Sequence, residues 1–160
     1  MKIITLFTML IAMVTTTLNA AEKEVALDGY CPVCYIAAGK ANKGDAQFAA
    51  EHDGKTYHFV NEEIKQMFLA EPAKFLPQFN GLCAYGIAKG KEFKADPTQF
   101  TVVDGKIYLN KDAEIAKLFK ADTAALIKDA DAKWPTLKAA MMKKEEQMMK
   151  EKEMKAKEAK

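Results

Sequence analysis

The sequence predicts a small α+β protein: two β-hairpin-plus-helix units with additional C-terminal helices, forming a single small domain. Two dipeptides, Asp53-Gly54 and Asp104-Gly105, each lie between runs of strand-forming residues, which is the strongest short-range signal for a hairpin. Behind each hairpin, apolar residues recur at helical spacing after a capping residue, Asn61 in the first case and Asp112 in the second. These local signals define the two units.

A two-residue loop also determines which residues of a hairpin face each other. The expected pairs are Phe48–Phe59, Ala49–His58, Ala50–Tyr57, Phe100–Leu109 and Val102–Ile107. A shift of 51 positions superposes the two units, and Asp53, Tyr57 and Phe68 then match identical residues. However, this shift places the apolar face of the first hairpin on the opposite face of the second hairpin. A duplicated unit and a mere sharing of turn and cap chemistry therefore both stay open.

The C-terminal part changes in composition near Leu137. A further helix is expected from Thr123 to Lys133, and the dipeptide Trp134-Pro135 predicts its end. Residues 138–160 carry 8 Lys against 5 Glu, with Met/Lys/Glu-rich composition, and we expect a helical or disordered tail. Five methionines lie in it: Met141, Met142, Met148, Met149 and Met154. They are typical of a surface for a cell-envelope protein partner, and thioethers can also hold Cu(I).

The first 20 residues have the pattern of a cleaved export signal. Met1 and Lys2 precede an apolar run of about 12 residues, too short to span a bilayer, followed by small residues ending at Ala20. We therefore predict a signal peptide over 1–20, an α+β domain over 21–137 and the tail over 138–160. The mature chain is expected to be periplasmic or secreted, without a membrane anchor.

Composition excludes several functions. All 24 basic residues are lysine and the chain has no serine, so a serine nucleophile is impossible and the guanidinium fork that reads guanine is missing. We expect no nucleic-acid partner. No complete set of nucleophile, base and orienting group is visible, so we expect no enzymatic activity.

The chemistry-bearing residues are the three cysteines and one histidine. Cys31 and Cys34 form a CxxC, and Cys83 follows about fifty residues later. Two thiolates can bind a soft metal ion, Cu(I) or Zn(II), with Cys83 and His58 as possible further ligands. The alternatives are thiol–disulfide redox chemistry at Cys31 and Cys34, and a non-catalytic structural or interaction module with a disulfide and a spare buried thiol.

Residues 26–137 resemble the YHS-domain family of small exported proteins. The motifs that carry the resemblance are Leu27-Asp28-Gly29-Tyr30, Pro32-Val33, Asp53 to Phe59, Glu71 to Phe75, Gly81 to Gly86, Val103 to Asn110 and Trp134-Pro135. The resemblance implies a metal-associated scaffold and an exported protein. It implies a common cysteine at Cys83, whereas Cys31 and Cys34 replace residues usual in the family, and its known metal ligands correspond to Val60 and Ile64.

Overall fold

The computed structural model describes residues 24–158, so the predicted export signal over 1–20 lies outside the described residues. The first unit contains the 3-10 turn η1 (Ala26–Gly29), α1 (Pro32–Ala37), β1 (Asp45–His52), β2 (Lys55–Phe59), α2 (Glu62–Ala70) and α3 (Pro72–Phe75). The second contains η2 (Gln78–Gly81), α4 (Ala84–Ala88), β3 (Asp96–Val103), β4 (Lys106–Asn110) and α5 (Ala113–Ala121). The long helix α6 (Thr123–Glu158) follows. The predicted α+β domain of two hairpin-plus-helix units is confirmed.

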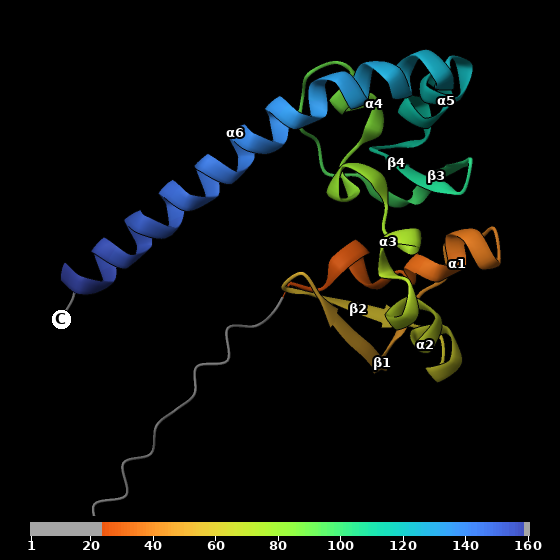
Figure 1. The fold of residues 1–160 in the computed structure, drawn as a ribbon, viewed down its shortest axis with the longest axis horizontal. Coiled ribbons are helices and arrows are strands. Elements are labelled where there is room, and N and C mark those ends of the chain that lie inside the picture. Colours follow the sequence, from red (N-terminus) through yellow and green to blue (C-terminus); the bar gives the residue numbers. More distant parts are fainter. Residues whose placement is uncertain (1–23, 159–160) are drawn as a thin grey trace, which may run out of the picture.

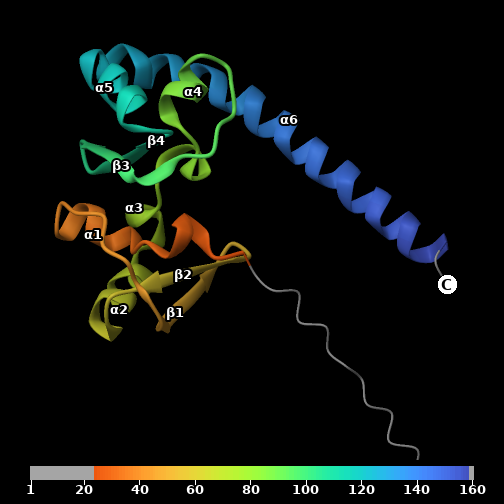
Figure 2. The same ribbon diagram turned by 180° about the vertical axis from the view of Figure 1, so that it is seen from behind.

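The two units are stacked, and α6 crosses the second unit before it extends past the body (Figure 1). The reverse view shows the same stacking, with β1 and β2 in one unit and β3 and β4 in the other (Figure 2). Each hairpin is a separate two-stranded antiparallel sheet. A two-stranded ribbon is marginal by itself, so each depends on the helices packed against it.

Local chemistry explains why both units form the same elements. Asp53 and Asp104 have φ of 48° and 49°, and the glycine after each also has positive φ, as a type I′ hairpin turn requires. The side chains of Asn61 and Asp112 accept 2.9 Å hydrogen bonds from the backbone three residues on, which caps α2 and α5. The expected turns and caps are confirmed.

Strand register agrees with four of the five expected pairs. Ala49–His58, Ala50–Tyr57, Phe100–Leu109 and Val102–Ile107 are paired, but Phe59 lies opposite Asp45, so the expected Phe48–Phe59 pair is wrong. The register shifts between Asp45 and Ala49, and the same irregularity recurs between Asp96 and Phe100. A bulge of this kind adds residues to one strand without adding partners on the other.

Packing between distant segments explains why the apolar faces of the two hairpins do not superpose. Tyr57 packs on Phe68 with ring centroids 5.2 Å apart, and in the second unit Tyr108 packs on Phe119 in the same way at 5.8 Å. These faces are equivalent. The opposite face of β4, with its buried Ile107, is covered as well, in a core cluster that also contains Tyr35 of the first unit. The two units therefore share one element order, and only β4 is buried on both faces.

Contacts between the units bring them into one domain. The Tyr35 hydroxyl donates a 2.9 Å hydrogen bond to the Pro97 carbonyl, and the ring of Tyr35 lies 4.9 Å from that of Phe100. Burial raises the pKa of the Tyr35 hydroxyl. Tyr35 thus links α1 to β3 by both a polar and an aromatic contact.

The predicted helix end before Pro135 is wrong, since α6 runs through this residue to Glu158. Proline removes one helical donor and costs about 3 kcal/mol in a helix interior. Trp134 and Leu137 pack on the core on either side of it, and Lys133 donates to the Ala88 carbonyl. This packing holds α6 against the second unit across the proline. Within residues 24–158, no helix is both long and apolar enough to cross a membrane.

Candidate functional site

The CxxC lies at the start of α1, inside the core of the first unit. Cys31 is the residue before the helix and Pro32 its first residue, a position where a missing backbone N–H costs nothing. The Cys31 N–H donates a 2.8 Å hydrogen bond to the Asn42 carbonyl, which anchors the helix start to the following loop. Cys31 and Cys34 are 0% and 3% exposed. Both thiols therefore lie in a site largely closed to water.

The two thiols interact with each other. Burial, together with hydrogen bonding and charge interaction with Cys31, raises the pKa of the Cys34 thiol from 9.0 to about 12. A side-chain hydrogen bond with Asn42 acts in the opposite direction. Cys34 is therefore a protonated thiol at neutral pH, with a partner sulfur in contact and one polar side chain beside it.

Cys83 lies in the second unit at the position that Cys31 has in the first. It precedes α4 as Cys31 precedes α1, and its Sγ accepts a 3.4 Å hydrogen bond from the Gly86 N–H. Its Sγ also lies 3.9 Å from Oδ1 of Asn110. All three cysteines are free thiols and buried. Cys83 therefore has its own set of partners in another core cluster.

His58 lies on β2, paired with Ala49. A Cβ built on Gly29 would lie 3.4 Å from its Nδ1, so the imidazole is stacked against the backbone of η1. Among residues 24–158, no group of three or more His, Cys, Asp and Glu side chains is placed to hold a metal ion. The four expected ligands are therefore not gathered into one site, and Cys31 and Cys34 stand as a pair.

The second unit lacks a counterpart of this pair. Gly86 occupies the position of Cys34, and a Cβ there would lie 2.8 Å from Cδ2 of Phe93 and 3.0 Å from the Lys91 carbonyl oxygen. Those contacts are too close for any side chain without a shift of Phe93 and of the backbone. The dithiol is thus specific to the first unit.

Two polar residues beside the thiols were missed by the sequence analysis. Asn42 lies in the loop after α1 and contacts Cys34. Asn110 is fully buried at the end of β4, where the first unit has Phe59, and its Nδ2 has no hydrogen-bond partner in the described structure. An asparagine in the place of an aromatic residue, visible once the units are aligned, was the available signal.

The arrangement of Cys31 and Cys34 can do two things chemically. Two thiols three positions apart at a helix start can release protons and bind a soft cation, or can be oxidised together to a disulfide. Tetrahedral Zn(II) needs four ligands, and this pair supplies two. Comparison with known proteins adds nothing to this geometry, because no family model, no curated protein and no solved structure matches the chain.

Proposed function

We propose that the chain is an exported, non-enzymatic protein of the YHS type, periplasmic or secreted, that binds one Cu(I) ion between the thiolates of Cys31 and Cys34. The observation that carries this proposal is the pair of free, mutually contacting thiols at the start of α1, 0% and 3% exposed. Thiolates are soft ligands that favour Cu(I) over hard cations. Zn(II) fits less well, because it would need two further ligands.

Proton release accompanies binding at this pair. The pKa of Cys34 is raised to about 12, so at neutral pH its proton must leave when the metal binds. Cu(I) affinity is therefore expected to rise with pH. The Asn42 side chain favours the ionised form of Cys34 and so supports the bound state.

The test is a competition titration of the reduced, metal-free full chain with Cu(I) held by a coloured chelator, followed by native mass spectrometry. One Cu(I) per chain is expected in wild type, with loss of that ion in Cys31→Ser and in Cys34→Ser. Cys83→Ser is the matched control and should keep it, because Cys83 lies in a different cluster. Absence of stoichiometric uptake, or uptake that survives both substitutions, refutes the proposal.

A dithiol redox function is the second candidate, favoured by the contact between the two thiols. Oxidation removes two protons and two electrons from Cys31 and Cys34 and forms one S–S bond between them, while the S–S bond of a disulfide substrate breaks and takes up the same protons and electrons as two thiols. The high pKa of Cys34 and the burial of both sulfurs disfavour rapid exchange. Alkylation and intact mass after equilibration with glutathione distinguish the two: a chain two mass units lighter, cycling with the buffer, supports redox chemistry.

The C-terminal part of α6 is proposed as the surface for a cell-envelope partner. Met142, Met148, Met149 and Met154 are exposed large hydrophobic residues. Methionines recur seven positions apart, which places them along one stripe of the helix, but no two are three or four positions apart, the spacing that brings two side chains together on one face. This spacing favours protein contact over metal binding. A deletion of residues 138–160 that loses no crosslinked partner would count against it.

A further inference from the structure

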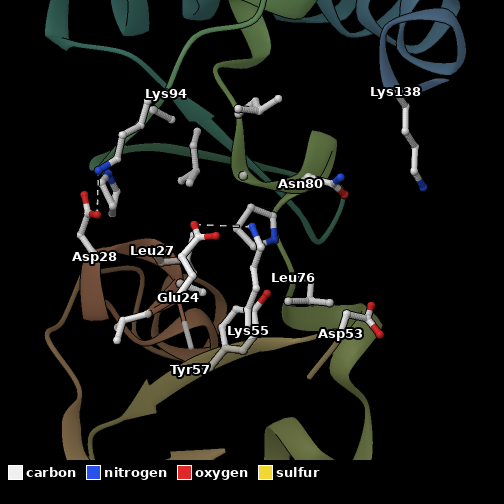
Figure 3. A pocket seen from close by; sticks show the side chains of 18 residues that line it. Glu24, Leu27, Asp28, Asp53, Lys55, Tyr57, Leu76, Asn80, Lys94 and Lys138 are labelled. Atoms are coloured by element: carbon white, nitrogen blue, oxygen red, sulfur yellow. Dashed lines mark hydrogen bonds and ion pairs between the residues drawn. The ribbon is translucent and has the colours of Figure 1, made fainter. Parts of the chain in front are cut away.

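A cavity of about 560 Å³ lies where the two units meet, away from the dithiol. Neither Cys31 nor Cys34 lines it. Its walls come from the start of the first unit, β2, the link between the units, β4 and α6 (Figure 3). Its volume is in the range of sites that hold small organic molecules.

Part of the wall of this cavity is apolar, and four leucines lie in it. Leu27 and Leu76 come from the first unit and the link, and Leu82 and Leu109 from the second unit. Figure 3 shows Leu27 and Leu76 on either side of the Tyr57 ring. Such walls favour a ligand with an apolar body.

One polar group, at the tip of a largely buried side chain, points into the cavity. Tyr57 is 8% exposed, and its side chain reaches from β2 into the opening with its hydroxyl at the tip (Figure 3). Within residues 24–158 this hydroxyl makes no hydrogen bond, and it is accessible to solvent in the opening. Burial, together with the negative charges of Asp53 and Glu24, raises its pKa, so it remains a neutral donor and acceptor. It is available to a carbonyl or amide of a ligand.

The charged groups of the rim carry both signs. Lys94 pairs with Asp28 at 2.8 Å and Lys55 with Glu24 at 3.9 Å. Lys138 has no acidic partner in the described structure, and Asp53 contacts only the imidazole of its neighbour His52, at 3.4 Å. Figure 3 shows Lys138 descending from α6 above Asp53, which lies at the β1–β2 turn, with both residues on the same side of the view. Lys138 is thus without a paired acid, and the Asp53 carboxylate, whose side chain is 85% exposed, has only His52 beside it.

We propose that this cavity binds a small zwitterion with an apolar body, a short apolar peptide with free termini. The carboxylate of the ligand pairs with Lys138, its ammonium group with Asp53, and the Tyr57 hydroxyl bonds to its backbone amide. The apolar side chains lie against the leucines of the inner walls. A purely anionic or cationic ligand would leave one of the two rim charges unmatched.

The test uses the dipeptide Leu-Leu as probe, with N-acetyl-Leu-Leu and Leu-Leu-amide as analogues that lack one charge each. Binding to the full chain is followed by amide shifts in ¹H–¹⁵N spectra. Saturable shifts are expected at residues lining the cavity, and each capped analogue should bind about twofold to fivefold more weakly, the range that an exposed ion pair supplies.

Variants assign the contacts. Lys138→Gln removes the partner of the ligand carboxylate, so Leu-Leu and Leu-Leu-amide should bind this variant equally. Asp53→Asn removes the partner of the ammonium group, so Leu-Leu and N-acetyl-Leu-Leu should bind that variant equally. Tyr57→Phe should weaken all three probes alike. Lys143→Gln, on the same helix but not at the cavity, is the matched control and should change nothing.

Three results would overturn the proposal: no saturable shift, shifts confined to other residues, or capped analogues that bind as tightly as Leu-Leu. Circular dichroism of each variant separates loss of binding from loss of fold. Because the cavity does not include the dithiol, these results are independent of the Cu(I) titration.

Discussion

Ionisation of Cys34 should reduce the stability of the reduced protein in mildly alkaline solution. Its pKa is about 12 in the folded chain and 9.0 without the fold, because burial and the contact with Cys31 disfavour the thiolate. The folded state therefore holds this proton where the unfolded state releases it. The stabilisation is complete below pH 9 and is lost as the pH rises from 9 toward 12.

The magnitude at pH 10 follows from these two pKa values. About nine-tenths of the unfolded thiol is ionised there and almost none of the folded thiol, which lowers the free energy of unfolding by about 1.4 kcal/mol. A folded pKa one unit lower leaves this figure nearly unchanged. Tyrosines with raised pKa values, such as Tyr35, add a loss of their own at higher pH.

The assay is urea unfolding of reduced, metal-free protein at pH 7.5 and pH 10, in wild type and in Cys34→Ala. The loss of stability between the two pH values should be about 1.4 kcal/mol smaller in the variant, and the tyrosine contribution cancels in this difference. Cys83→Ala removes another buried thiol and serves as control. Equal losses in wild type and Cys34→Ala, within about 0.4 kcal/mol, would refute the reasoning.

Four other changes test the fold. Phe119 is fully buried, so Phe119→Ala should lower the free energy of unfolding, measured in urea, by about 3 to 5 kcal/mol. Leu118 is 50% exposed, so Leu118→Ala should change it by less than about 0.5 kcal/mol. Similar values for both variants would contradict the described core. Asn61→Ala should cost about 1 kcal/mol through loss of the α2 cap, and an unchanged urea midpoint would count against that cap. Gly44→Ala should cost about 3 kcal/mol or more, since its Cβ would lie 2.4 Å from a backbone carbon of the adjacent strand, and a midpoint close to wild type would exclude this close approach. Deletion of 143–160 should reduce the helical circular dichroism signal but leave the melting temperature of the body unchanged; a drop of several degrees would mean that the tail packs on the body.

Features set by neighbouring residues were predictable from the sequence. The two Asp-Gly turns and the caps at Asn61 and Asp112 depend on backbone conformations that a few residues determine locally. The pairing close to each turn, such as Ala50 with Tyr57, follows from the loop length alone. Farther from the turn the prediction was wrong, because the bulge moves Phe59 opposite Asp45.

The candidate site also has features that the sequence predicts and features that depend on packing. The contact of Cys31 with Cys34 follows from their spacing at a helix start, which the sequence contains. Their separation from Cys83 could not be read from the sequence, because it depends on how the two units stack. The contacts of Asn42 and Asn110 depend on packing within each unit, and the cavity depends on how the two units stack.

The fold class, the turns, the caps and the nearness of two thiols could be predicted from the amino-acid sequence, since each depends on interactions over a few residues. Three features required the folded chain to be seen: β4 is buried on both faces, α6 continues through Pro135, and the thiols are shielded from water. These features depend on burial of apolar surface between distant segments. That free energy is shared by the whole core and outweighs local preferences such as the helix-ending tendency of proline.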